Sequence, residues 1–428
     1  MFKTIRNAWK IEDLRRKILF TLFIVLLYRI GNSVPVPWVD TALLSTYFAS
    51  LQNTVLGLYN VMSGSAFSQA TIFALSIQPY INASIIIQLL CIAIPALERL
   101  QKDGGEEGKN KLERITRYAT VGIGLLQGLA YYILIKNNNL LVEGGTGIWP
   151  AIVIVLTFTA GSALLMWLGE QITEFGIGNG ISIILFVGIV SRFPVQISQM
   201  VRNTISTPSN WWIYTLMLLG ALAIIVLIVI VTNAERRIPI QYSKRVVGRK
   251  MYGGQSTHLP MKVNMSGVLP VIFAQSIASL PATIAAFVPK WSDGWFLKFF
   301  DTGNIPYMVL YFLLILFFSY FYSTIQFNPI EIANNLKKNG GFIPGFRAGK
   351  PTSEFIQKVL TKITLFGAIY LAIIAIVPLI ISYCSDTAAT SGISLGGTSV
   401  IIVVGVALET VQAIESQMIM RHYKGFLE

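Results

Sequence analysis

The side chains that could perform catalysis are few in this chain and do not fall into catalytic patterns. Only two histidines occur, His258 and His422, and both lie in polar segments, so the sequence offers neither a histidine-based metal site nor a buried catalytic triad. Gly349 and Lys350 approach a phosphate-binding loop, but the earlier glycine and the following serine or threonine of such a loop are missing. We therefore expect no enzyme activity, no nucleotide hydrolysis, no metal and no cofactor.

Charged residues are also scarce where a coupled transporter would need them. Ion or proton coupling requires ionisable groups near the middle of the membrane, whereas the middles of the long apolar runs here are almost free of charge. A multi-span solute transporter remains the alternative function.

Long apolar runs are the dominant elements of the sequence. Apolar residues make up 54% of the 428 residues and charged residues only 12%, which is more apolar material than a soluble core of this size uses. A run of roughly 20 residues crosses ~30 Å of hydrocarbon as a helix, and ten such runs predict an all-α, polytopic membrane protein with ten transmembrane helices. The predicted spans are 18–36, 74–94, 115–135, 148–168, 181–200, 211–232, 268–288, 307–327, 363–383 and 396–413. We expect Pro79 to bend the second span, because proline removes a backbone donor.

The distribution of basic residues predicts the orientation. The formal net charge is +13, and most of the Lys and Arg residues lie in alternate loops, on the side that also holds both ends of the chain. The positive-inside rule therefore predicts that the N- and C-termini are cytoplasmic.

Two loops on this basic side, about 233–266 and 328–362, are longer than a connection requires. Their basic residues gather in clusters, which favours a cytoplasmic partner with a negative surface. Orientation and attraction to anionic lipid headgroups explain the same clusters, and this alternative stays open.

Two smaller irregularities concern the apolar part of the chain. The segment 57–69 lacks basic residues and is too polar for lipid; it predicts either a short helix folded back among the spans or a loop at the outer interface. Gln88, Gln127 and Gln275 place amides inside spans. They indicate either bonds between helices or a wet path.

Four motifs carry a close resemblance to a known family. They are SIQPYINASIIIQLL at 76–90, MWLGEQITE at 166–174 with GIGNGIS at 176–182, QSTHLPMKVN at 255–264, and NLKK at 335–338 leading to FIPGFR at 342–347. In this order they make the sequence closely similar to the SecY family, the channel subunits of bacterial protein translocases, over nearly the whole chain.

The resemblance implies two pseudo-symmetric, inverted halves, residues 1–203 and 204–428, around a central pore. An apolar ring is expected to seal the pore, because aliphatic side chains resist wetting and still yield to a passing chain. The ring positions are Ile77, Ile81, Ile181, Leu185, Ile272 and Ile402.

Three further sites follow from the same resemblance. A plug at about 57–69 includes Gly57, Tyr59, Asn60, Met62, Ser63, Gly64, Ser65, Ala66 and Phe67. A lateral gate, where the halves part toward lipid, includes Gln88, Gln127, Gln275 and Ser276. A docking face includes Lys244, Arg245, Arg249, Lys250, Lys337, Lys338 and Arg347.

The implied function is that of a gated, passive conduit in the bacterial plasma (inner) membrane. It would pass unfolded polypeptides across the membrane and release transmembrane segments sideways into lipid. The implied partners are the SecE and SecG subunits, the SecA motor ATPase, the ribosome, signal sequences and nascent polypeptides, and membrane lipid.

Overall fold

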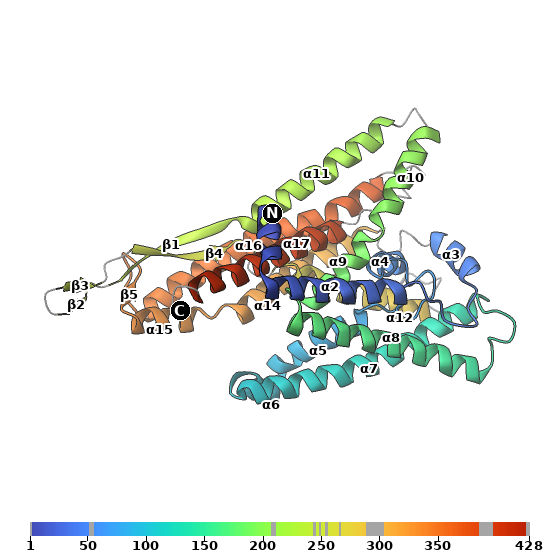
Figure 1. Ribbon diagram of the computed structural model, residues 1–428, viewed down its shortest axis with the longest axis horizontal. Coiled ribbons are helices and arrows are strands. Elements are labelled where there is room, and N and C mark those ends of the chain that lie inside the picture. Colours follow the sequence, from blue (N-terminus) through green and yellow to red (C-terminus); the bar gives the residue numbers. More distant parts are fainter. Residues whose placement is uncertain are drawn as a thin grey trace.

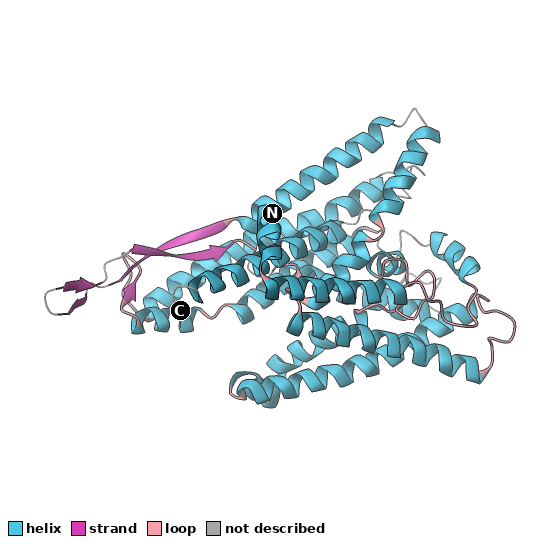
Figure 2. Ribbon diagram, in the orientation of Figure 1, coloured by secondary structure: helices cyan, strands magenta, loops and turns pink. Residues whose placement is uncertain are grey.

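A computed structural model describes residues 2–50, 55–206, 211–242, 245–247, 250–252, 256–264, 267–287, 304–384 and 397–424. Long helices run roughly side by side, and a small sheet projects from one end of the bundle (Figures 1 and 2). Each of the ten predicted spans falls on a helix or on a pair of consecutive helices. The prediction of an all-α membrane protein is therefore confirmed, and the strands are confined to the connections between spans.

The span helices differ in length. They are α2 (Glu12–Gly31), α5 (Gln78–Ala93), α7 (Gly105–Asn137), α8 (Ile148–Phe175), α9 (Gly180–Val190) with α10 (Phe193–Ser206), α11 (Trp211–Asn233), α12 (Leu269–Phe287), α14 (Ile305–Gln326), α16 (Lys350–Cys384) and α17 (Gly397–Lys424). By length and composition alone, six helices in the described part of the chain qualify as membrane spans, or seven if the bent pair formed by α5 and the next helix is counted as one.

Shorter helices occupy the connections. They are α1 (Phe2–Lys10), α3 (Thr41–Ser50), α4 (Val55–Met62), α6 (Pro95–Lys102) and α15 (Pro329–Lys338). In Figure 1, α15 lies at the end of the bundle that carries the sheet, and α3 lies at the opposite end. We call these the sheet end and the far end.

Pro79 does not bend the second span, so that prediction was wrong. α5 begins at Gln78, and Pro79 therefore lies in the first turn, where the missing N–H would have no partner in the helix anyway. The bend occurs at the other end, where α5 and α6 meet at 106°. Ile94 there has extended backbone and Pro95 starts α6.

The two long loops fold together instead of forming separate tips. β1 (Glu235–Tyr242) pairs antiparallel with β4 (Ser256–Lys262) from the same loop and with β5 (Gly341–Phe342) from the other loop. A short hairpin, β2 (Arg245–Val247) with β3 (Lys250–Tyr252), extends from it. The sequence analysis did not predict these strands.

A small core of its own holds the sheet against α15 and α16. Its buried members are Ile238, Ile240, Met261, Leu336, Ile343, Ile356 and Leu360. Because side chains on a strand alternate between faces, Ile238 and Ile240 share the covered face of β1. The sheet is therefore fixed on the helices that follow it in the chain.

The largest apolar core lies in the middle of the bundle, where α5, α8, α9, α12, α14, α16 and α17 meet. A second core, toward the far end, joins α3, α7 and α8 to the segment that follows α4. The first half of the chain meets the second where α12 packs against α4, α5 and α7, and also where α17 packs against α1 and α9. The candidate site lies at the junction that α12 forms.

Candidate functional site

Five of the six side chains predicted to form the pore ring lie on four helices, α5, α9, α12 and α17, and Ile77 directly precedes α5. Ile181 is half-buried and packs against the central core, in which the other five are buried. These five are Ile77, Ile81, Leu185, Ile272 and Ile402. Residues four apart share one face of a helix, which explains how α9 presents both Ile181 and Leu185. Ile77 caps the start of α5, four residues before Ile81. The structure therefore brings together residues that are widely spaced in the sequence, and their sealing role stays a prediction.

The predicted plug forms a short helix buried between the two halves. α4 contacts α9 on one side and α12 on the other. None of the nine named plug residues is exposed, whereas Gln69, at the end of the predicted segment, is exposed. Of the two structures left open for this segment, a helix among the spans and a loop at the outer interface, the structure has the helix.

The end of α4 has the hydrogen bonds of a glycine-closed helix. The Ser65 N–H donates to the Asn60 carbonyl over 3.0 Å, and the Gly64 N–H donates to the Val61 carbonyl over 3.2 Å. Gly64 has φ +67°, and a Cβ at this position would lie 2.8 Å from the Gly188 carbonyl oxygen. Glycine is therefore required both by the left-handed turn and by the close approach of α9.

Met62, the last residue of α4, connects the two halves at the level of the ring. Its sulfur accepts from Gln78 Nε2 on α5 over 3.3 Å and from Gln275 Nε2 on α12 over 3.4 Å. The Oε1 atoms of both amides are buried without a hydrogen-bond partner in the described part of the chain. Because thioether sulfur is a weak acceptor, the two amides hold the end of α4 loosely.

Tyr28 of α2 and Asn32, the residue directly after this helix, hold the turn after α4. Tyr28 donates its hydroxyl to the Ser63 carbonyl over 3.4 Å, and Asn32 Nδ2 donates to the same oxygen over 3.3 Å. Both side chains are buried. The sequence analysis missed both, because their partner is a backbone atom, and no residue pattern marks it.

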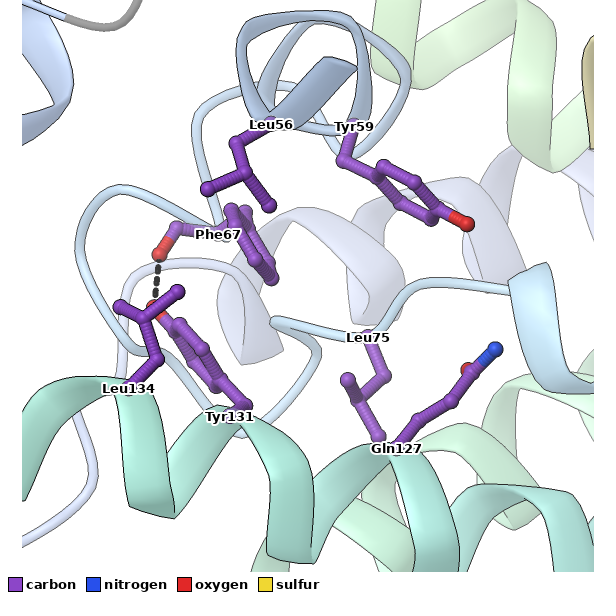
Figure 3. A pocket seen from close by; sticks show the side chains of 7 residues that line it. All are labelled: Leu56, Tyr59, Phe67, Leu75, Gln127, Tyr131 and Leu134. Carbon is purple, nitrogen blue, oxygen red and sulfur yellow. Dashed lines mark hydrogen bonds between the residues drawn. The ribbon is translucent and has the colours of Figure 1, made fainter. Parts of the chain in front are cut away.

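The polar residues predicted to line a lateral gate differ in burial and in their contacts with the other half. Gln275 and Ser276 on α12 are buried, and α12 contacts both α5 and α7. Gln88 is half-buried and donates to Ser84 Oγ of its own helix over 3.4 Å, so this bond does not cross between the halves. Gln127 on α7 is half-buried and faces a small cavity beside α4 (Figure 3).

The basic residues predicted to dock a partner belong to the sheet end. Lys337 and Lys338 are exposed in the last turn of α15, and Arg347 is exposed in the loop that follows β5. Arg245 lies in β2 and Lys250 in β3. Lys244 and Arg249 lie outside the described residues. The pairing of β1 with β5 thus joins the two predicted docking loops into one surface.

The fold and the site define a class of protein: a polytopic α-helical membrane protein with the fold of a protein-conducting channel. A solved structure described as that of a protein conducting channel matches with a TM-score of 0.68 at 17% identity, covering 94% of this chain and 92% of the other. Sec61 in the canine ribosome-channel complex from the endoplasmic reticulum matches with a TM-score of 0.64 at 15% identity, covering 94% of this chain and 92% of that one.

Sequence comparison identifies the family within this class. The family model described as SecY matches residues 71–411. The protein translocase subunit SecY of Streptomyces coelicolor is 44% identical over 442 residues, covering 100% of both chains. The chain therefore belongs to the SecY family.

Proposed function

We propose that this chain is the central, pore-forming subunit of a general protein-secretion translocase and that it acts as a gated, passive conduit. Unfolded polypeptides pass through its centre, and transmembrane segments leave sideways into lipid. The observation that carries the proposal is that all six ring positions, from α9, α12, α17 and the start of α5, belong to or pack against the central core, and that α4 contacts two of these helices, α9 and α12. The relative from Streptomyces coelicolor is itself named as a translocase subunit.

In this proposal the ring and the plug seal the idle channel together. Aliphatic side chains give ions and water no hydrogen bonds, so a narrow ring of them resists wetting. α4 lies against α9 and α12, which supply three of the ring positions, and therefore supports the ring from the far end. The chain acts without an enzymatic step of its own, and an external motor or chain elongation supplies the energy.

The lateral gate separates two halves, residues 1–203 and 204–428. The contacts of α12 with α5 and α7 are the ones that must part when a transmembrane segment leaves the pore. Gln275 and Ser276, buried polar residues on α12, support this role because polar groups weaken apolar packing at a seam. Hydrogen bonding between helices explains these two polar residues equally well. A cross-link between the two halves tests whether the seam must open.

The sheet end is the proposed cytoplasmic docking face in the bacterial plasma membrane, with both termini on that side. Sec61 was solved in a ribosome-channel complex, and exposed cations such as Lys337, Lys338 and Arg347 would bind ribosomal RNA through salt-sensitive electrostatics. The same face would receive the SecA motor. SecE and SecG would complete the membrane complex.

Replacement of ring residues by glycine tests the proposal. We expect Ile77→Gly, Ile81→Gly and Ile402→Gly to cause ion leak through the idle channel and to loosen the selection of signal sequences, because each removes an aliphatic side chain from the seal. The leak is measured as ion efflux from vesicles that contain the assembled complex.

An apolar substitution at an exposed, lipid-side position gives the control. Leu126→Gly on α7 removes a comparable side chain that is 71% exposed, and its leak should match that of the parent. If the ring variants also seal as well as the parent, the ring does not close the pore and the channel function is wrong.

A further inference from the structure

Phe67 lies shortly after the end of α4, inside a group of aromatic rings from three other elements. Its ring stacks on Tyr131 of α7 with the centroids 4.4 Å apart and the planes at 18°. Phe48 of α3 meets it at 5.0 Å and 64°, and Tyr59 of α4 lies at 6.1 Å. Phe67 is 6% exposed and Tyr131 is 2% exposed, so this contact is fully within the core of the far end.

Tyr131 also holds the backbone at the same position. Its hydroxyl donates to the Phe67 carbonyl oxygen (Figure 3). Tyr131 in turn packs against Phe158 of α8, with centroids 5.0 Å apart. A stacked aromatic pair stabilises the fold by more than the area that it buries. Removal of the hydroxyl would also leave a buried carbonyl oxygen without its donor, which costs more free energy than the bond itself contributes. Residue 67 is therefore firmly attached to α7 and α8.

The α4 side of the turn is held by longer hydrogen bonds, including those that Tyr28 and Asn32 donate to the Ser63 carbonyl over 3.4 Å and 3.3 Å. Met62 is bound through a weak sulfur acceptor, and the Tyr59 hydroxyl meets Ser279 Oγ at 3.4 Å. A cavity of about 30 Å³ separates Leu56 and Tyr59 from α7 at Gln127 and Tyr131. Leu56 and Tyr59 are only half-buried where they pack against the core of the far end, whereas Phe67 is buried within it.

The loosely and the firmly held parts meet at a sharp turn. Gly64 has φ +67° and Ser65 has φ +75°. A left-handed backbone at a residue with a side chain is unfavourable, so the turn persists only while the hydrogen bonds that close α4 hold it. This turn is the point where the chain changes direction between Met62 and Phe67.

We propose that Phe67, fixed on α7 by Tyr131, is the pivot of the plug. α4 swings about the turn at Gly64 and Ser65, and the chain from Phe67 onward stays on α7. Tyr131 is a positioning residue in this arrangement. The inference rests on the proposed plug function. It adds that the movement of α4 ends at Phe67 and that Tyr131 holds the chain from Phe67 onward in place.

Distances between paired spin labels test the pivot in the assembled complex in lipid vesicles. One label pair joins Leu56→Cys on α4 to Lys136→Cys at the end of α7, and the other joins Gln69→Cys, beyond the pivot, to Lys136→Cys, with both native cysteines replaced. Lys136 and Gln69 are exposed. When a polypeptide is arrested in the channel, we expect the distance between the labels of the Leu56 pair to change. The distance between the labels of the Gln69 pair should stay the same.

Substitution of Tyr131 tests its positioning role. Tyr131→Leu removes both the stack and the hydroxyl, so the Gln69 pair should also shift, and leak through the idle channel should rise about tenfold. Tyr131→Phe keeps the ring and should have a smaller effect on both. Tyr132→Phe, a change of a buried neighbour on the same helix, should leave both readouts as in the parent.

The outcomes separate the inference from the function on which it rests. If the Leu56 and Gln69 pairs shift together in the parent, the pivot does not lie at Phe67. If Tyr131→Leu leaves the Gln69 pair fixed, Tyr131 does not hold the pivot. If neither pair shifts on arrest of a polypeptide, α4 is not a displaceable plug, and the plug function fails together with the pivot.

Discussion

Met62 shows how a single atom can connect the two halves of the chain. Its sulfur is the acceptor for amides from both halves of the chain, on α5 and on α12. An oxygen in the same place would hold these amides more tightly, because sulfur is the weaker acceptor. In the proposed gated channel, such a contact would satisfy two buried donors while the channel is closed. It would also need little free energy to break when the channel opens.

The sulfur contact can be tested by a double-mutant cycle. Met62→Leu keeps the approximate volume of the side chain but leaves the Nε2 donors of Gln78 and Gln275 without their acceptor. A weak buried bond of about 1 kcal/mol corresponds to a rise in the leak of the idle channel of about fivefold, measured as ion efflux from vesicles.

The second substitution of the cycle removes a donor. The double variant, Gln275→Leu with Met62→Leu, should show a smaller increase in ion leak than the two single variants predict together. Loss of one partner leaves the other buried without a hydrogen bond, whereas loss of both leaves neither. Strictly additive effects would show that the sulfur and this amide do not interact.

At the residue scale, sequence reasoning reached the positions that carry a motif and missed those that do not. Ile77 and Ile81 lie inside the motif at 76–90, and the resemblance pointed to them. Tyr131 lies in a run of apolar residues, and its partner is the backbone oxygen of Phe67, 64 positions away. A contact to a distant main-chain atom leaves no pattern in either segment, so only the fold reveals it.

One side chain, Asn328, caps the start of α15, the helix that carries two of the predicted docking lysines. Asn328 Oδ1 accepts from the N–H groups of Ile330 over 3.1 Å and Glu331 over 3.4 Å at the start of the helix. The other end of α15 carries Lys337 and Lys338. Fraying of the first turn would therefore loosen the helix that presents these cations.

We expect Asn328→Ala to destabilise α15 by about 1 kcal/mol, as the loss of a side-chain cap commonly does. Amide hydrogen exchange in the first turns of α15 should then be about fivefold faster. Asn339→Ala, at the exposed other end of the same helix, gives the matched control and should exchange as the parent does. Equal protection in Asn328→Ala and the parent would argue against the cap.

At the element scale, hydropathy predicted the helices well and the strands not at all. Ten runs of about membrane length fell on helices because spanning backbone must satisfy its own hydrogen bonds. β1 lies in a loop that was read only for charge, although Ile238 and Ile240 alternate along it with Arg237, Pro239 and Gln241. Pro79 was misread because the same residue type breaks the middle of a helix and suits its first turn.

Parting of the two halves is the motion on which the proposed lateral release depends. Gln78 and Gln275 come from different halves, and each has its Nε2 within 3.4 Å of the same sulfur atom. We expect a short, cleavable thiol cross-linker between Gln78→Cys and Gln275→Cys to block translocation, and cleavage to restore it. The measurement is the amount of substrate protected from protease inside vesicles, with the single-cysteine variants as controls.

Undiminished translocation through the cross-linked complex would show that the halves do not need to separate at this level. The pore would then have to widen elsewhere, and the proposed seam at α12 would be wrong.

The docking face is tested by reversing a charge on it. We expect Arg347→Glu to abolish motor-driven translocation while the chain still inserts into the membrane, because the exposed guanidinium would be replaced by a group that repels an anionic partner. Arg202→Glu, an equally exposed charge reversal on α10, should translocate normally. Normal translocation by Arg347→Glu would contradict the docking role.

The pairing of β1 with β5 has a mechanical consequence. β1 follows α11, β4 leads into α12, and β5 stands between α15 and α16; Lys262 Nζ at the end of β4 also donates to Gln412 Oε1 of α17 over 2.8 Å. Through these connections the sheet is attached to α11, α12, α15, α16 and α17 of the second half. A force on any part of the sheet is therefore transmitted to all of these helices, so that they would move together as one rigid body.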